Sequence, residues 1–312
     1  MQNLILSLQC VLPMFLILML GMLIRRSKIV PEDSFNQMNL MTFRFLMPCL
    51  LFYSVYAADI NNSFQPRTIV FLLCWVMGWF ILSYIVFAKA EPNPKNRGAY
   101  IQTAYRSNLA VIGVTLAQSM LGDSGIATMA MAIAVIVPLF NVLAVITLET
   151  CRGGVVSVRQ MIINIMRNPL IWGCLVGILF LALGIKLPKT VEGVVAKIGT
   201  TASTMMLITL GASIQLKGVM KNLRQVIFCD MLRLVISPVC ALTVGILLGF
   251  RGDALGVILI AAASPTAAAS YPMALACDSN YELTGQSVVT TSFFCSLTLF
   301  LWIFLLKQMG FL

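Results

Sequence analysis

Ten apolar runs, separated by charged and turn-forming residues, limit the folds open to this chain of 312 residues. A bilayer core of about 30 Å takes about 20 helical residues to cross. The runs are close to that length, and they lie near residues 4–24, 35–57, 67–88, 98–119, 125–148, 161–183, 190–213, 224–249, 254–276 and 282–306. We therefore predict an all-α membrane protein of about ten transmembrane helices joined by short loops.

The composition indicates that most of the surface faces lipid. Hydrophobic residues make up 60% of the chain and charged residues only 10%, whereas soluble domains carry roughly 25% charged residues. The net charge of +10 comes from short basic clusters between the apolar runs, without a basic face interleaved with aromatic residues. The expected partner is therefore the lipid bilayer, and nucleic acid is not expected.

The chain lacks the residues of common metal and hydrolytic sites. Histidine is absent, and the nine cysteines are scattered without a Cys-x-x-Cys pair. We predict no metal site, no cofactor, no disulfide framework and no enzymatic activity, because serine–histidine and zinc–histidine arrangements are both impossible. The alternative of an intramembrane enzyme rests on Gly122 and Asp123, which only faintly resemble aspartyl intramembrane proteases and lie in a predicted loop.

The basic residues predict the orientation of the spans. No basic segment precedes the first run and three basic residues follow it, so we expect a retained span and not a signal peptide. With the amino terminus outside, thirteen Lys or Arg lie at cytoplasmic ends and six lie opposite, as the positive-inside rule favours. The predicted location is the cell membrane, with both termini outside. The thirteen are Arg25, Arg26, Lys28, Lys89, Lys95, Arg97, Arg106, Arg152, Arg159, Arg167, Lys217, Lys221 and Arg224.

Five spans in each half predict an inverted repeat, because an odd number makes the second half enter the membrane from the opposite side. Pro31 and Pro188 are 157 residues apart, and so are Asn108 and Pro265. The same offset without gaps superimposes all five pairs of predicted spans. We therefore predict a first five-helix repeat over residues 1–156 and a second over 157–312.

The offset pairs two segments, 108–113 and 265–270, that are expected to break the fourth and ninth spans. Proline removes a helical hydrogen bond, and glycine tolerates conformations that a helix interior does not. Half-helix amino termini that meet near the midplane would favour an anion. The alternative is that Gly113 only allows close packing and Pro265 only kinks a helix. The predicted substrate-binding residues are Asn108, Gly113, Pro265, Arg106, Thr115 and Ser270.

Ionisable residues within the spans are functional candidates, because burying them in a membrane is costly. Asp230 and Arg233 lie three residues apart on one helical face, where they could pair as a structural unit or act in coupling or gating. Asp230 and Glu149 are candidate proton sites. Arg44 has no acid in its own span, so it snorkels, pairs across helices or faces a cavity. Arg106 either counters a substrate carboxylate or serves as a topology charge.

Several segments across nearly the whole chain resemble the auxin efflux carrier family, which includes plant PIN-type carriers and bacterial homologues assigned to organic acids. They are residues 39–52, 108–113, 168–171, 210–211, 233–238 and 251–253, together with Pro265. The resemblance implies two inverted five-helix repeats whose fourth and ninth helices cross at their breaks. It also implies an elevator-like motion, in which the first two helices of each repeat form a scaffold, and a tendency to form homodimers.

The chain departs from the family pattern in two places. Thr115 follows Gly113 and Val114 where the family usually has Gly-x-Pro, so a softer break is expected. Only about ten residues separate the fifth and sixth spans, so the long cytoplasmic loop of many plant members is missing.

These observations predict a secondary transporter of small organic anions such as carboxylates. Export is the expected direction, because a potential of about −100 mV favours expulsion of one negative charge by ~2.3 kcal/mol. The alternatives are an ion-coupled importer of organic acids, and a channel or transmembrane sensor.

Overall fold

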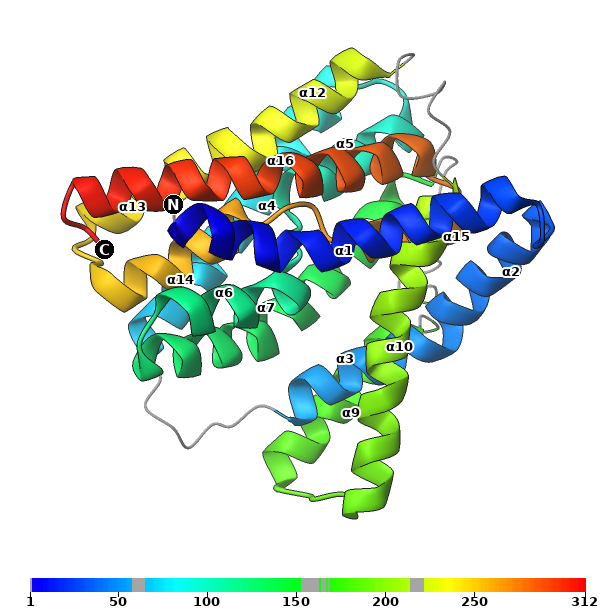
Figure 1. The fold of residues 1–312 in the computed structure, drawn as a ribbon, viewed down its shortest axis with the longest axis horizontal. Coiled ribbons are helices and arrows are strands. Elements are labelled where there is room, and N and C mark those ends of the chain that lie inside the picture. Colours follow the sequence, from blue (N-terminus) through cyan, green and yellow to red (C-terminus); the bar gives the residue numbers. More distant parts are fainter. Residues whose placement is uncertain (1, 58–64, 153–162, 164–166, 168, 214–221) are drawn as a thin grey trace.

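The computed structural model describes residues 2–57, 65–152, 163, 167, 169–213 and 222–312, which form helices without a β-strand (Figure 1). Residues 153–162, which make up most of the loop between the fifth and sixth runs and include Arg159, lie outside the described residues, as do Asn168, Lys217 and Lys221. The helices are α1 (Gln2–Ser27), α2 (Glu32–Met41), η1 (Thr42–Leu46), α3 (Met47–Tyr56), α4 (Pro66–Ala90), α5 (Pro94–Tyr105), α6 (Leu109–Met120), α7 (Asp123–Thr150), α9 (Pro169–Leu183), α10 (Lys189–Ser213), α12 (Leu223–Met231), η2 (Leu232–Ile236), α13 (Ser237–Leu247), α14 (Gly252–Ala263), α15 (Ser270–Ala276) and α16 (Tyr281–Gln308).

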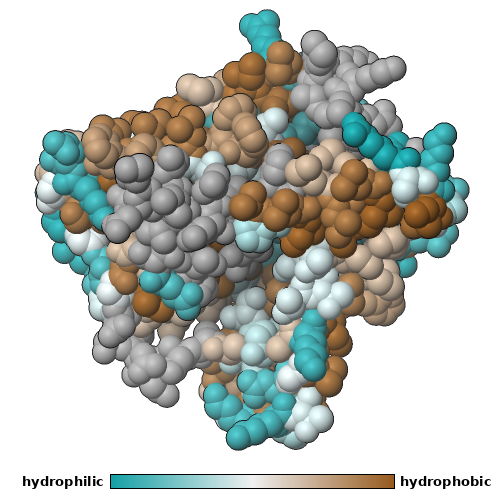
Figure 2. All heavy atoms as spheres, in the orientation of Figure 1, coloured by the Kyte–Doolittle hydropathy of each residue, from teal (hydrophilic) through white to brown (hydrophobic). Residues whose placement is uncertain are grey.

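Length and composition make many of these helices suitable for a bilayer. In the described residues, six helical stretches are long and apolar enough to cross one, and α9 and α14 are shorter apolar helices. Figure 2 shows brown apolar surface along the long helices and teal polar atoms mainly toward the ends of the molecule. The prediction of an all-α membrane protein is confirmed, while the count of ten crossings stays a prediction.

Two long helices contain a π-helical turn just before a proline. The turn η1 precedes Pro48 and the turn η2 precedes Pro238. A proline lacks the N–H group for the ordinary helical bond, and its ring clashes with the carbonyl four residues earlier. The wider π turn separates these groups. The chain can therefore continue through α2, η1 and α3, and through α12, η2 and α13, without ending the helix.

Glycines allow the helices α1, α3, α9 and α10 to approach one another closely. A methyl group at Gly211 would collide with the carbonyl oxygen of Leu18, and one at Gly21 would collide with that of Ile208. A Cβ atom at Gly173 of α9 would lie 2.5 Å from the carbonyl oxygen of Pro48 in α3. Small residues make such close contacts between apolar helices possible. In Figure 1, α3, α9 and α10 form the lower lobe of the molecule.

Candidate substrate-binding site

Two helices break and meet in the interior of the molecule. Helix α5 ends at Tyr105 and α6 begins at Leu109, while α14 ends at Ala263 and α15 begins at Ser270. Between them, Ser107 and Thr266 form an isolated antiparallel bridge. The amide N–H of Asn108 donates to the carbonyl oxygen of Pro265 at 2.8 Å. The breaks therefore fall in the two predicted spans, and the two residues paired by the sequence offset contact each other directly. The predicted break over 108–113 is wrong beyond Asn108, because residues 109–113 are helical and the interruption lies at 106–108.

Arg233 binds buried carbonyl groups at the carboxyl ends of both broken helices. It donates to the oxygens of Ser264 at 2.8 Å, Ala261 at 3.0 Å and Tyr105 at 3.3 Å. The carboxyl end of a helix carries unpaired carbonyls and partial negative charge, which a cation stabilises. Arg233, only 2% exposed, thus holds the ends of α5 and α14 together.

The expected pair between Asp230 and Arg233 does not form. Among the described residues, the donors of Arg233 go to backbone carbonyls, and Asp230 accepts a hydrogen bond from Thr290 at 2.9 Å. The prediction relied on helical spacing alone. Spacing places two side chains on one face, but it does not reveal competing partners on neighbouring helices.

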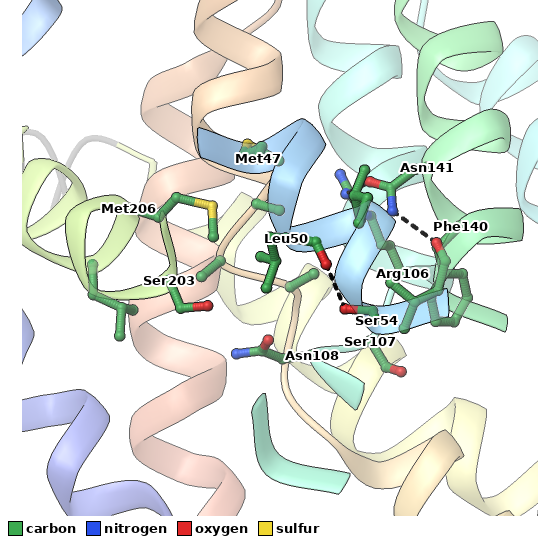
Figure 3. Close-up of a pocket in the computed structure, with 16 residues that line it drawn as sticks. Met47, Leu50, Ser54, Arg106, Ser107, Asn108, Phe140, Asn141, Ser203 and Met206 are labelled. Carbon is green, nitrogen blue, oxygen red and sulfur yellow. Dashed lines mark hydrogen bonds between the residues drawn. The ribbon is translucent and has the colours of Figure 1, made fainter. Parts of the chain in front are cut away.

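A cavity lies beside the crossing of the broken helices (Figure 3). The space between its lining residues is about 590 Å³, a volume that includes open space outside the cavity. The cavity walls come from both breaks and from three other helices. The lining residues are Met47, Leu50, Leu51 and Ser54 of α3; Arg106, Ser107 and Asn108 of the first break; Val137, Phe140 and Asn141 of α7; Ser203, Met206 and Leu207 of α10; and Ala267, Ala268 and Ala269 of the second break.

Arg106 places a buried positive charge on the wall of this crossover cavity. It donates to the side-chain oxygens of Asn141 at 2.6 Å and Gln102 at 3.2 Å, and the side chain is 2% exposed. Its interpretation as a cytoplasmic topology charge is therefore wrong, because the residue lies at the helix break and not at a helix end in contact with solvent. These two amides and the third partner, the Met273 sulfur at 2.9 Å, are all neutral, so the guanidinium keeps its positive charge toward the cavity.

Neutral polar groups accompany this cation. Asn108 precedes the first turn of α6 and its side chain projects toward Ser203 in the cavity (Figure 3). The hydroxyl of Ser107 is buried and has no hydrogen-bond partner in the described structure. A buried hydroxyl without a partner is costly, and a bound polar ligand would relieve that cost.

The remaining predicted site residues occupy different places. Gly113 packs inside α6 against Met129 of α7, where an added Cβ would lie 3.2 Å from the sulfur, and it does not line the cavity. The close-packing interpretation therefore fits Gly113. Pro265 contributes its carbonyl to the crossing. Ser270 is buried at the start of α15, outside the cavity lining. The backbone of Thr115 is helical, and its side chain lies outside the described atoms.

Glu149 lies outside the crossover cavity, near the end of α7. Its side chain is 7% exposed and forms an ion pair with Arg152 at 3.4 Å. It lines a second cavity, together with Arg44, Arg152 and Arg167. Its proposed role as a proton site stays a prediction.

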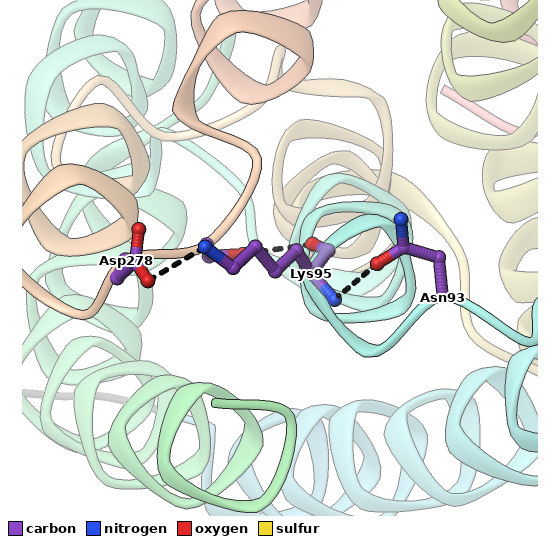
Figure 4. Close-up of polar contacts among 4 residues, drawn as sticks. Asn93, Lys95 and Asp278 are labelled. Carbon is purple, nitrogen blue, oxygen red and sulfur yellow. Dashed lines mark hydrogen bonds and ion pairs between the residues drawn. The ribbon is translucent and has the colours of Figure 1, made fainter. Parts of the chain in front are cut away.

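Polar contacts also hold the outer ends of the broken helices. The Lys95 ammonium, at the start of α5, lies 2.6 Å from the carboxylate of Asp278, which follows α15 (Figure 4). At the start of α14, Asp253 accepts from the backbone N–H groups of Gly122 at 3.2 Å and Gly125 at 3.1 Å, at the start of α7. The start of α5 is thus fixed to the loop before α16, and the start of α14 is fixed to the start of α7.

Sequence reasoning missed the cavity residues contributed by α3, α7 and α10. Asn141 was the one with a usable signal, because an amide inside an apolar span needs a partner. Ser54 and Ser203 carry no such signal, since hydroxyl side chains in helices commonly bond their own backbone, as Ser54 does to Leu50 at 2.7 Å.

In this helical membrane protein, two broken helices cross beside a buried cation. This architecture is typical of membrane transporters. Comparison with known sequences agrees: residues 6–303 match the family described as membrane transport protein. The chain belongs to this family, the auxin efflux carrier family. This is a transporter family, so the prediction that the chain is not an enzyme is confirmed.

Two archaeal relatives extend over the same length. One, from Methanothermobacter thermautotrophicus, is named an uncharacterized transporter and is 21% identical over 303 residues, covering 95% of this chain and 97% of the relative. Another uncharacterized transporter, from Methanocaldococcus jannaschii, is 21% identical over 303 residues, covering 94% of this chain and 96% of the relative. The resemblance therefore includes both halves of the chain.

Proposed function

We propose that this membrane transporter is a secondary carrier of small organic anions such as carboxylates, and that the crossover cavity is its binding site. The observation that carries this proposal is the buried cation Arg106 on a cavity wall whose described residues include no Asp or Glu. Asn108 and Ser107 add hydrogen-bond donors beside it. Buried donors and positive charge favour a negative group, and the surrounding Leu, Met and Phe side chains suit an apolar remainder.

We further propose ten spans arranged as two inverted repeats, 1–156 and 157–312. The bond between Asn108 and Pro265 supports this arrangement, because it joins two positions related by the offset of 157 residues. The outer contacts support it too. Asn280 donates to Asn96 at 2.8 Å. The offset of 157 residues pairs Asn96 with Asp253 and Asn280 with residue 123, which lies between the two glycines whose N–H groups Asp253 accepts from. These contacts differ in chemistry, but they join positions that the offset relates, which supports the proposed repeat.

The position of the cavity supports an elevator-like motion. One wall comes from α3 and α10, which pack with α1 and α9 through the glycine contacts, and the other wall comes from α7 and the two breaks. Movement of the second group past the first would carry the cavity across the membrane. We also propose that the protein lies in the cell membrane with both termini outside, and that it forms a homodimer.

Export without a coupling ion is the favoured mode. Arg233 already supplies a fixed cation to the carbonyl ends of both broken helices, a place where a mobile cation could otherwise bind. Flux in liposomes at clamped voltage, with and without a proton gradient, tests this. Ion-coupled import predicts a dependence on the proton gradient that is lost on substitution of Asp230 or Glu149.

A channel or a sensor is the other alternative. A carrier predicts saturable flux that shows counterflow, a channel predicts currents far above carrier turnover, and a sensor predicts binding without flux. Flux and current measurements on the same proteoliposomes separate these three cases.

The binding site is tested on purified protein after a thermal-shift screen of organic acids has identified the strongest ligand. Replacing Asn108 with Ala should weaken binding of that acid about tenfold to a hundredfold, because a hydrogen bond to a charged group contributes ~1.5–3 kcal/mol. Asn36→Ala, at an exposed position of α2, is the matched control. Wild-type affinity and flux in Asn108→Ala would overturn the assignment.

A further inference from the structure

We propose that Arg44, Arg152 and Arg167 form a second anion-binding site, which takes a carboxylate or phosphate group. The three guanidinium groups line one cavity, and among the described residues that line it Glu149 is the only acidic one. The cavity lies between η1, the end of α7, the start of α9 and the end of α15. None of these arginines belongs to the crossover cavity.

The charges in this second cavity do not cancel. Glu149 pairs with Arg152, at 3.4 Å. The side chains of Arg44 and Arg167 make no hydrogen bond or ion pair with the described part of the chain, and both residues are exposed. Residues 153–166 contain no Asp or Glu, so the adjoining segment supplies no carboxylate either. Two positive charges therefore remain for a ligand, and guanidinium groups bind multi-oxygen anions through paired hydrogen bonds.

The second cavity lies along the same helices as the crossover cavity. Helix α7 lines the crossover cavity with Asn141 and the second cavity with Glu149. Eight helical residues at 1.5 Å each separate these side chains by about 12 Å. Likewise, α3 and η1 contribute Met47 to one cavity and Arg44 to the other. The positive-inside rule places this second cavity on the predicted cytoplasmic side.

Two sources could supply the anion. A soluble organic anion would pass this cavity on its way to the crossing, whereas an anionic lipid would insert its headgroup from the bilayer, as basic pockets between membrane helices allow. The shared helices favour the soluble anion, and we assign the cavity as its capture site. The capture role rests on the proposed transport function, but binding of an oxyanion does not.

Chemical protection tests binding without any knowledge of the substrate. The full chain in nanodiscs of zwitterionic phosphatidylcholine is treated with phenylglyoxal, and modified arginines are quantified by mass spectrometry with and without inorganic phosphate or succinate. Modification of Arg44 and Arg167 should slow about threefold when the anion is at twice its dissociation constant. Arg26 and Arg224, exposed at the same predicted face, are the controls. Equal rates with and without both anions would overturn the site.

A second arm distinguishes the sources. The reaction is repeated in nanodiscs that contain anionic phosphatidylglycerol. If soluble anions still protect Arg44 and Arg167 there, the capture role is supported. If the lipid alone protects these arginines and soluble anions add nothing, the anion site stands but the capture role is overturned.

Transport kinetics test the capture role directly, with the acid identified by the thermal-shift screen. The double variant Arg44→Gln, Arg167→Gln should raise KM about three- to tenfold on the predicted cytoplasmic face, with maximal flux and the opposite face unchanged. Inside-out and right-side-out vesicles present the two faces, and Arg26→Gln, Arg224→Gln is the control of equal charge. If the double variant keeps the maximal flux of the wild type and its KM is also unchanged, the capture role is overturned. Absence of saturable flux in the wild type, with phosphate protection intact, overturns the proposed transport function instead.

Discussion

The two helix breaks occupy related positions but contribute different chemistry. The first break, between α5 and α6, lines the crossover cavity with the polar side chains of Arg106, Ser107 and Asn108. The second break, between α14 and α15, lines it with the small residues Ala267, Ala268 and Ala269. Helix α6 has 12 residues and α15 only 7, so the first break also offers the stronger helix amino terminus.

The two breaks therefore have different roles in ligand binding. Polar groups of the first break can bind a charged ligand, while the alanines of the second leave the space that the ligand occupies. Arg233 serves both breaks by binding carbonyl groups from α5 and from the end of α14. Substitutions in the first break should therefore change affinity, and substitutions that loosen the crossing should change stability.

The largest effect is expected from Arg233→Gln. It removes three charge-assisted bonds from buried carbonyls, and we expect a loss of at least about 3 kcal/mol in the free energy of unfolding. Denaturation in detergent, followed by fluorescence, measures it. Arg224→Gln, on the exposed part of α12, is the control and should change little. A wild-type unfolding curve for Arg233→Gln would mean that the guanidinium does not hold the two breaks together.

Arg106→Gln should have the next largest effect, on affinity. The loss of the buried charge should weaken binding of the screened organic acid about tenfold to a hundredfold, equivalent to ~1.5–3 kcal/mol. The affinity of Arg106→Lys should lie between those of the wild type and Arg106→Gln, because lysine keeps the charge but lacks the planar fork that contacts Asn141 and Gln102. Titration calorimetry measures both. Equal affinity of the wild type and both variants would mean that the first break does not recognise the acid.

A smaller effect is expected from Pro265→Ala in the second break. The carbonyl that accepts from Asn108 remains after this change, and only the restraint of the proline ring is lost. We expect a loss of about 0.4–1 kcal/mol in stability, with the affinity for the acid nearly unchanged. A drop in affinity as large as that of Arg106→Gln would contradict the division between the two breaks.

Gly113→Ala should have the smallest effect. The added methyl group meets flexible side-chain ends, such as the Met129 sulfur at 3.2 Å, and alanine gains about 1 kcal/mol in helix propensity. These terms oppose each other, so we expect a net change in stability below about 1 kcal/mol and unchanged affinity. A strong loss of affinity, measured by the same calorimetry, would restore Gly113 as a binding residue.

The sequence by itself determined the class of protein and the location of the breaks. Apolar runs and scarce charges are stable in lipid, and proline, glycine and asparagine are unfavourable in the interior of a helix, so Asn108 and Pro265 could be selected without coordinates. These are local properties of the chain. The family resemblance rested on the same local segments.

Only the tertiary structure decided which partners those residues have. Helical spacing suggested that Arg233 pairs with Asp230, but carbonyls from α5 and α14 bind it instead. The sequence position of Arg106 suggested a topology charge. The residue is instead buried, where Asn141 of α7 accepts a hydrogen bond from it. The grouping of Arg44 with Arg152 and Arg167 also joins distant segments. Such contacts depend on how helices pack across the chain, and no local pattern encodes them.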